Sequence, residues 1–392
     1  MCNPADSWSS SDARSRGSAC SSWWAGMTTD ADHRTMMSPP PSSCPSCNCR
    51  ATTLRRQADT IEHHLYAALP GASHLRWRAM AGRPILVTGT HRSGTTWTGT
   101  ILSLSGEALP IHEPFNPAYP RSWLAEPPRR WFEYVDEPAT EAWTQQMLQV
   151  LALRPPVAAL IRRERSPRHA LRVLQEAIDA ERGRRRGLRP LLKDPIAFFS
   201  AEWLATSFGS EVVVLVRHPA AFAGSLKRLG WSFDFRNLTS QTRLMDGPLA
   251  GHADEVRTAA REERDIIGVA ITLWRVVNSV ALDYKAKHPT WIVRRYEDLA
   301  MDPMGAFERL YAALGLEWSP SVESGVRRHS ADRNVTDVAL TDKGGVIRNS
   351  RVTMWTWAGR LTPEEIARVR SGTEEIAAEF YSDQDWKPPR SA

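Results

Sequence analysis

The stretch Gly89-Thr90-His91-Arg92-Ser93-Gly94-Thr95-Thr96-Trp97 decides the fold of this chain. It follows the apolar run Ile85-Leu86-Val87-Thr88, which is typical of a buried parallel strand, and it precedes residues 98–104, which can continue as a helix. A strand, a glycine-bounded loop and a helix make the frame of a P-loop, in which backbone N–H groups and a helix N-terminus bind phosphate oxygens. The sequence therefore predicts an α/β protein with a phosphate-binding loop.

The spacing within this loop is that of the Walker A motif: a glycine, four residues, a second glycine and two hydroxyl residues. The Walker lysine is missing, because Thr95 stands at its position. Arg92, inside the loop, can supply the lost positive charge. The loop therefore indicates a phosphate donor other than ATP.

A second apolar run, residues 212–217, predicts a central strand and ends in Arg217. A Walker B strand ends in an aspartate that holds Mg²⁺, whereas an arginine there repels the metal and attracts a second phosphate. Ser225 lies about two turns into the helix expected at residues 220–228, so its hydroxyl can reach the same anion. These residues predict a nucleotide with two separated anionic groups and no metal.

The remaining pattern predicts strands at residues 108–112, 191–193 and 291–293. It predicts helices at residues 61–69, 140–153, 167–181, 198–207 and 261–287, and a last helix that Thr362 caps and Pro363 opens. Strands that alternate with helices indicate a three-layer α/β sandwich around a central parallel sheet.

Several motifs in this order resemble those of the sulfotransferases that use 3′-phosphoadenosine 5′-phosphosulfate (PAPS). Residues 92–97 resemble the family's 5′-phosphosulfate loop, in the Arg-Ser-Gly form of the carbohydrate, tyrosylprotein and bacterial members. Residues 216–219 with Ser225 resemble the 3′-phosphate motif. Residues 192–195, 296–299 and 357–361 resemble the Lys-Asp-Pro, Tyr-Glu-Asp-Leu and Trp-x-x-Lys/Arg-Leu elements. The resemblance covers residues 84–386.

The resemblance implies roles for particular residues. The loop residues that would bind the 5′-phosphate are Arg92, Ser93, Gly94, Thr95, Thr96 and Trp97. Arg92 and Lys193 would contact the transferring sulfate. Arg217 and Ser225 would hold the 3′-phosphate, and the loop 343–351 would close over it through Arg348 and Ser350. A serine that assists the sulfate in tyrosylprotein members is replaced here by Trp355, so that role is not expected.

Two neighbouring residues are candidates for the catalytic base. Glu113 matches the acidic base of the tyrosylprotein and carbohydrate enzymes, and it can accept a proton if partial burial raises its pKa. His112 is the alternative, because cytosolic members use a histidine. In an extended chain the two side chains would point to opposite sides. We favour Glu113.

Composition narrows the function only slightly. The net charge of +6 favours anionic ligands and would also suit a nucleic-acid-binding protein. The run Arg184-Arg185-Arg186 lacks interleaved aromatic residues, so we interpret it as a solvated loop and expect no nucleic-acid partner.

The N-terminal residues differ from the rest of the chain. Residues 1–52 are rich in Ser, Pro and Cys, so we expect them to be disordered, with residues 53–392 forming a single domain. They contain all five cysteines: Cys2, Cys20, Cys44, Cys47 and Cys49. The last three could bind zinc, but no matching pair follows, so we predict no metal site.

No run of 18 apolar residues and no signal peptide are evident. We therefore expect a cytoplasmic enzyme, and the Ala- and Arg-rich composition suggests a bacterial one.

Two other functions remain open. The chain could be a P-loop kinase or NTPase, although the missing Walker lysine and Arg217 argue against it, or a non-catalytic nucleotide-binding relative. The acceptor is expected to be a hydroxyl of a carbohydrate, a lipid such as a glycolipid, or another small molecule. Trp231, Phe233 and Phe235 either line its pocket or pack in the core.

Overall fold

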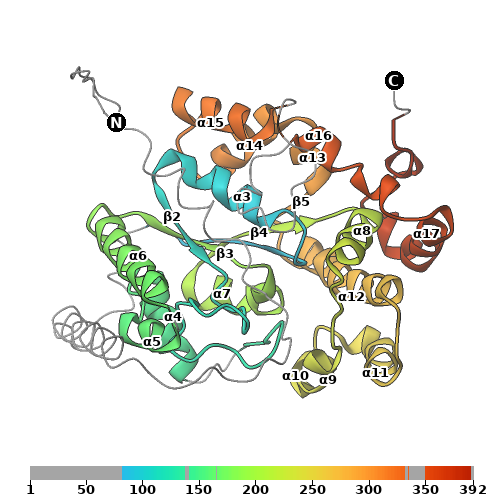
Figure 1. Ribbon diagram of the computed structural model, residues 1–392, viewed down its shortest axis with the longest axis horizontal. Coiled ribbons are helices and arrows are strands. Elements are labelled where there is room, and N and C mark those ends of the chain that lie inside the picture. Colours follow the sequence, from blue (N-terminus) through green and yellow to red (C-terminus); the bar gives the residue numbers. More distant parts are fainter. Residues whose placement is uncertain (1–81, 137–140, 165, 332–333, 335–348, 390–392) are drawn as a thin grey trace, which may run out of the picture.

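The computed structural model of the protein describes residues 82–136, 141–164, 166–331, 334 and 349–389. Five strands form one parallel sheet in the order β2-β3-β1-β4-β5 (Figure 1). Their bounds are β1 Ile85–Gly89, β2 Ala108–His112, β3 Arg189–Lys193, β4 Glu211–Val216 and β5 Ile292–Arg295. Because the strands are parallel, their carboxyl ends meet at one edge, where ligands bind in sheets of this type.

Helices cover both faces of the sheet. Those used below are α3 Thr95–Leu102, α6 Pro167–Arg185, α7 Ala201–Phe208, α8 Pro219–Leu229, α12 Ile266–Lys287, α13 Tyr296–Met301, α14 Pro303–Ala313, α15 Pro320–Ser330, α16 Ser350–Thr353 and α17 Pro363–Ala377. The others are α4 Glu141–Leu151, α5 Val157–Arg163, α9 Arg236–Thr239, α10 Thr242–Asp246 and α11 Ala253–Arg261. The predicted three-layer α/β architecture is confirmed.

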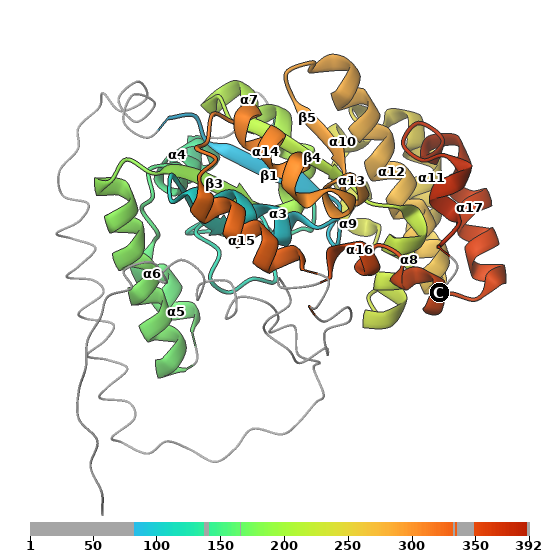
Figure 2. The same ribbon diagram turned by 90° about the horizontal axis from the view of Figure 1, so that it is seen from above.

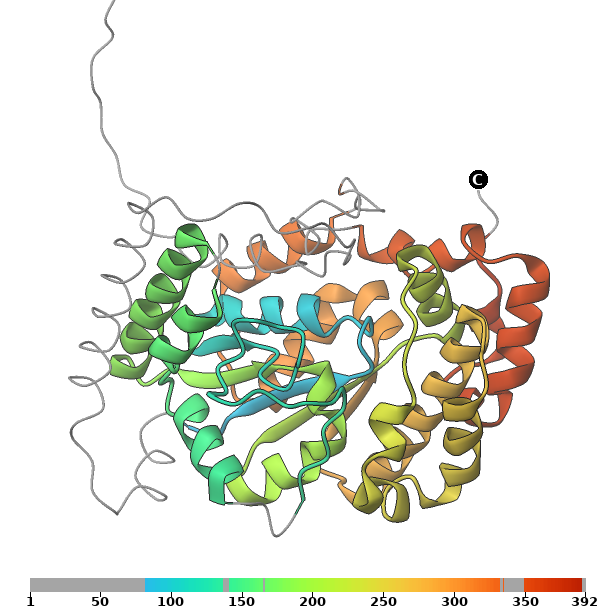
Figure 3. The same cartoon turned by 60° about the horizontal axis from the view of Figure 1, so that its bottom comes forward.

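Alternating residues of the central strands enter two separate cores. Val87 and Val213 pack with α3, α14 and α15 on one face. Leu86 and Val214 pack with α7, α8 and α12 on the other. Figures 1 and 3 show the sheet between these two helical layers, and Figure 2 views the molecule from the side of α14 and α15. Burial on both faces explains why the strands read as continuous apolar runs rather than alternating ones.

Some predicted boundaries differ from the structure. The helix predicted at residues 261–287 begins only at Ile266, because Arg261 is the last residue of α11 and Asp265 caps α12 by accepting from the Gly268 N–H at 2.7 Å. The helix predicted at 198–207 is a 3₁₀ turn, Pro195–Ser200, followed by α7.

The arginine run 184–186 was predicted as a loop, but α6 continues through Arg185. Arg184 and Arg185 each form an ion pair with Glu181 at 2.6 Å. These pairs one turn apart offset the local positive charge, which is why the helix extends further than its apolar pattern indicates.

Helix α12 is long and apolar enough to cross a membrane by length and composition alone, although Arg275 interrupts its apolar residues. In the structure 67% of its most apolar window is buried, and it packs against α8 and α17. Its apolar surface is therefore core surface.

The last helix, α17, begins as predicted. Thr362 and Glu365 form a reciprocal capping box, and Pro363 occupies the first turn. The predictions for residues 1–52, the five cysteines, the helix 61–69 and Arg348 lie outside the described residues.

Candidate functional site: a P-loop facing a buried Lys–Glu pair

Two glycines determine the path of the loop after β1. Gly94 has φ 95° at the start of α3, and a Cβ there would lie 2.4 Å from the Tyr296 ring. Gly89 has φ 140°, and a Cβ there would lie 2.2 Å from the Leu215 carbonyl oxygen. Only glycine fits both positions, so the loop is held against β4 and α13.

The first turn of α3 presents its backbone N–H groups without a side-chain cap. Such a helix N-terminus is suited to an anion. Ser93 stabilises the turn before it, because its hydroxyl and its N–H both donate to the Thr90 carbonyl, at 2.6 and 3.2 Å. A cavity lies next to this turn and is lined by Thr95, Thr96 and Trp97, among other residues. Trp97 packs edge-on against Tyr296.

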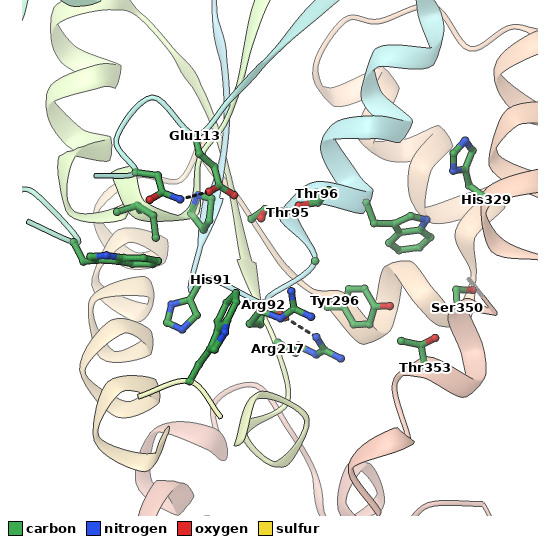
Figure 4. Close-up of a pocket in the computed structure, with 17 residues that line it drawn as sticks. His91, Arg92, Thr95, Thr96, Glu113, Arg217, Tyr296, His329, Ser350 and Thr353 are labelled. Carbon is green, nitrogen blue, oxygen red and sulfur yellow. Dashed lines mark hydrogen bonds between the residues drawn. The ribbon is translucent and has the colours of Figure 1, made fainter. Parts of the chain in front are cut away.

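The residues predicted to bind the two ends of a nucleotide converge. Arg217, directly after β4, donates from Nη1 to the Arg92 carbonyl at 2.6 Å. The Arg92 side chain donates from Nε to Ser225 Oγ at 3.0 Å. The Arg217 guanidinium also lies 5.0 Å from the centre of the Tyr296 ring, a cation–π distance. Two cations and a hydroxyl from three parts of the chain are thus joined by hydrogen bonds. Figure 4 shows the two arginines, Arg92 and Arg217, next to each other.

A second charged group occupies the ends of β2 and β3. Lys193 is completely buried and forms an ion pair with Glu113. The Asn116 amide donates to the other carboxylate oxygen at 2.6 Å, and the Glu113 N–H donates to the Lys193 carbonyl at 2.9 Å. Glu113 and Asn116 line the same cavity as Arg92 and Arg217.

The side chains of His112 and Glu113 do not point to opposite sides as an extended chain would place them. Glu113 has φ 44°, in the left-handed region, because the strand ends there. His112 Nε2 consequently lies 3.8 Å from Glu113 Oε1. The expectation of opposed side chains was wrong for this local reason.

The charges around Glu113 shift its pKa in the direction opposite to the shift that burial causes. Burial alone would raise the pKa of Glu113, but the charges of Lys193 and His112 and the hydrogen bonds from Lys193 and Asn116 lower it to about 2. The raised pKa suggested by the sequence is thus not found. Burial, and then the charge of Lys193, lower the pKa of His112 to about 3, so this imidazole is neutral at pH 7 and becomes charged only in the acid range in which Glu113 itself titrates.

Asp194 positions this group, a role that the sequence did not reveal. Its carboxylate accepts from the N–H groups of Phe115, Ile196 and Ala197 at 2.6, 2.9 and 3.2 Å. It therefore ties the segment after Glu113 to the segment after Lys193. Burial, and then the charge of Glu113, raise the pKa of Asp194 to about 7.

The Tyr-Glu-Asp-Leu element at residues 296–299 joins the site to the C-terminal helices. Glu297 accepts from the His218 N–H and from the Tyr381 hydroxyl, both at 3.0 Å. His218 stacks on Trp357 of the 357–361 element, with the ring centres 5.3 Å apart. These contacts fix the position of His218 and therefore of the neighbouring Arg217.

Of the other predicted residues, some line the cavity and others lie in the core. Ser350 lines the cavity, but its hydroxyl donates to the Ala300 carbonyl at 2.9 Å. Trp231 lines the cavity, whereas Phe233 and Phe235 are buried in the core. His91, Trp131 and His329 also line it, although no motif singled them out.

Comparisons with known proteins identify the family of this chain. The model of the sulfotransferase family matches residues 84–320. Human carbohydrate sulfotransferase 1 is 30% identical over 112 residues, which span 26% of this chain and 26% of the human protein.

Two solved structures also match. The sulfotransferase domain from the curacin biosynthetic pathway has 16% identity and a TM-score of 0.42, over 76% of this chain and 96% of that domain. STF1 from Mycobacterium tuberculosis H37Rv has 18% identity and a TM-score of 0.39, over 84% of each chain. With the family model covering more than half of its length, this chain belongs to the sulfotransferase family.

Proposed function

We propose that this protein transfers the sulfuryl group of PAPS to a hydroxyl group of a carbohydrate, lipid or other small molecule. The observation that carries the proposal is the shared cavity, which is lined by Glu113 and by Arg92 and Arg217. The buried Lys193 forms an ion pair with Glu113, and Arg92 donates to Ser225, so Lys193 and Ser225 are each one contact away from the cavity wall. Family membership supports sulfuryl transfer as the reaction. The printed name of the human relative is compatible with a carbohydrate acceptor.

The described residues fit a nucleotide with phosphates at two positions. The uncapped first turn of α3 suits the 5′-phosphate, and Arg217 with Ser225 suits the 3′-phosphate. Arg217 Nε is buried with no hydrogen-bond partner among the described residues, and a phosphate oxygen would supply one. Arg92 is proposed to contact the sulfate or the bridging oxygen, for which its guanidinium must leave Ser225.

The proposed reaction needs a base and a cation at the reacting atoms. Glu113 accepts the proton of the acceptor hydroxyl, the acceptor oxygen forms a bond to sulfur, and the bond from sulfur to the phosphate oxygen breaks. The leaving group is adenosine 3′,5′-bisphosphate. Lys193 stabilises the charge that develops on the transferring group.

The low pKa of Glu113 is consistent with this role. Lys193 is the strongest of the influences that lower it, and burial opposes them. A sulfate that draws the Lys193 ammonium toward itself therefore raises the pKa of Glu113 and makes Glu113 a stronger base. The proton acceptor is thus strengthened when the donor is bound.

Ligand-induced stabilisation tests the nucleotide and separates this proposal from a kinase or NTPase. Adenosine 3′,5′-bisphosphate at 100 times its Kd should stabilise the protein by about 2.7 kcal/mol without added metal. ATP with Mg²⁺ should not, because Arg217 stands where a Walker B carboxylate would bind the metal. Thermal unfolding measures both. Stabilisation by ATP with Mg²⁺ alone would contradict the proposal.

Activity is tested with labelled PAPS and a cell extract as the source of acceptors. We expect a labelled product that mass spectrometry identifies as a sulfate ester. Hydrolysis of PAPS with no sulfated product would argue for a different reaction.

A further inference from the structure

One histidine in the cavity has no part in the reaction proposed above. His91 precedes Arg92 in the loop and is 8% exposed. Its ring lies edge-on to Trp131 and Phe222, with ring centres 5.9 and 5.5 Å apart, and tilted to Trp231 at 6.3 Å. Figure 4 shows His91 on the side of the cavity that holds Glu113, away from His329 and Ser350.

The His91 imidazole is uncharged but polar. Burial, and then the nearby Arg92 charge, lower its pKa to about 4. Its Nδ1 is buried and has no hydrogen-bond partner among the described residues. A polar ring enclosed by aromatic side chains is costly unless something pairs with it. Because His91 lines the cavity, a bound molecule can supply that partner.

The surroundings of His91 combine apolar faces with a few polar groups. Trp131, Trp231, Pro195 and Ile196 contribute the apolar part of this side of the cavity. Asn116 and Glu113 contribute polar atoms next to it. Trp231 is held in place by the Arg92 guanidinium, which lies 5.6 Å from the centre of its ring.

This combination of apolar faces and polar groups distinguishes a sugar acceptor from a phenol acceptor. A pyranose ring has an apolar face of C–H groups, which packs on an indole, and several hydroxyls around its rim. A simple phenol has one hydroxyl, so it would pair with Glu113 and leave His91 without a partner. Sites that offer buried polar groups discriminate strongly against ligands that cannot pair with them.

We propose that His91, Trp131 and Trp231 form an acceptor subsite for a pyranose sugar. The indoles contact the sugar face, and His91 forms a hydrogen bond with a hydroxyl other than the one that is sulfated. His91 and the two indoles thereby select the acceptor and orient the reacting hydroxyl toward Glu113. This inference rests on the proposed function and specifies its acceptor.

Binding measurements on the full chain saturated with adenosine 3′,5′-bisphosphate test the inference. The probes are the methyl glycosides of galactose, glucose, mannose and N-acetylglucosamine, with 4-nitrophenol as the phenolic alternative. Saturation-transfer NMR detects weak binding, and titration gives the Kd. We expect at least one glycoside to bind in a saturable way and more tightly than 4-nitrophenol.

His91→Phe keeps an aromatic ring in the cluster but removes both nitrogens. It should raise the Kd of the bound glycoside about tenfold, the effect of one lost hydrogen bond. His91→Gln restores a polar group and should recover part of the affinity. The Kd of adenosine 3′,5′-bisphosphate should change less than twofold in both variants, which also shows that they are folded.

Different failures have different meanings. If the nucleotide does not bind to the wild-type protein, the proposed function fails. If the nucleotide binds but no glycoside does, if 4-nitrophenol binds more tightly than every glycoside, or if His91→Phe binds the glycoside as well as the wild type does, then the sugar subsite is overturned and the proposed function stands.

Discussion

At the scale of single residues, the pKa of Glu113 depends on the balance between its burial and the charge of Lys193. The pattern Leu192-Lys193-Asp194-Pro195 predicted a lysine at a strand end, and the structure places it there, completely buried. The sequence could not show that Glu113, 80 residues earlier, is its partner. That pairing arises because β2 and β3 are neighbours in register, with His112 opposite Lys193.

The role of Glu113 is tested by replacing it with glutamine. Glu113→Gln keeps the shape but cannot accept a proton, so kcat should fall about 10²- to 10⁴-fold. The Kd of adenosine 3′,5′-bisphosphate should stay within about twofold. Steady-state transfer from labelled PAPS and calorimetric titration measure the two quantities.

Asn116→Ala is the matched control, because it removes one hydrogen bond to the same carboxylate but leaves the proton acceptor. It should lower kcat about tenfold or less. Turnover by Glu113→Gln close to the wild-type rate would exclude Glu113 as the base.

The pKa of Glu113 leads to a prediction about stability and pH. Its folded-state pKa, about 2, lies below its ordinary value of 4.5. Glu113 therefore contributes stability above about pH 4.5 and loses that contribution as the pH falls toward 2. In Lys193→Met the largest of the influences that lower the folded-state pKa is removed, so this pKa rises and the stability that Glu113 contributes above pH 4.5 becomes smaller.

Urea denaturation between pH 3 and pH 7 checks this prediction. The four proteins to compare are the wild type, Glu113→Gln, Lys193→Met and the double variant, because the cycle isolates the contribution of Glu113 from those of other carboxylates. An equal pH dependence of the Glu113 contribution with and without Lys193 would refute the proposed balance.

At the scale of elements, the loop between β1 and α3 was the best-predicted part of the site. Its glycine spacing alone indicated a phosphate cradle, since the backbone must turn where a side chain cannot fit. The residue that leaves no room for a side chain at Gly94 could not be predicted, because Tyr296 comes from α13, some 200 residues later. The helix starts at Ile266 and Ala201 were missed because capping and a 3₁₀ turn interrupt an otherwise continuous apolar pattern.

Gly94→Ala should damage both stability and nucleotide binding. The left-handed backbone costs an alanine about 1–2 kcal/mol, and its Cβ would also collide with Tyr296. Because the collision moves the first turn of α3, we expect the affinity for adenosine 3′,5′-bisphosphate to fall by more than tenfold. Urea denaturation and calorimetric titration measure the two effects.

Gly106→Ala is the comparison for this variant. Gly106 has φ 72°, and a Cβ there meets no atom within 4 Å, so the substitution carries only the backbone cost. It should lose about 1–2 kcal/mol and bind the nucleotide normally. Equal stability losses in the two variants, with normal nucleotide binding in both, would show that Tyr296 does not constrain the loop.

At the scale of the whole molecule, the segment after α17 stabilises the buried residues next to Arg217. Tyr381 follows α17 and donates its hydroxyl to the buried Glu297 carboxylate, which also accepts from the His218 N–H beside Arg217. Burial raises the pKa of Glu297, while the hydrogen bonds favour its charged form. One carboxylate thus joins β4, α13 and the chain after α17.

Tyr381→Phe should lower the free energy of unfolding by about 1–3 kcal/mol, because a buried carboxylate loses a hydrogen bond. The loss should be greater at pH 7 than at pH 4, since the hydroxyl stabilises the charged carboxylate more than the neutral acid. Tyr311→Phe is the control: its hydroxyl donates to the Ile101 carbonyl, so its loss should not depend on pH over this range. Equal and pH-independent losses would contradict the role of Glu297.

The sequence by itself determined the class of fold, and it predicted an anionic ligand. Glycine spacing, a lysine-free loop and an arginine at a strand end are local features, and local sterics and charge already dictate what they can do. A cytoplasmic location remains a prediction from the sequence. Only the tertiary structure decided which groups face each other: Glu113 with Lys193, Arg92 with Ser225, and His91 between Trp131 and Trp231. Those neighbours depend on strand order and helix packing, which bring together residues up to 140 positions apart in the chain and which no local pattern encodes.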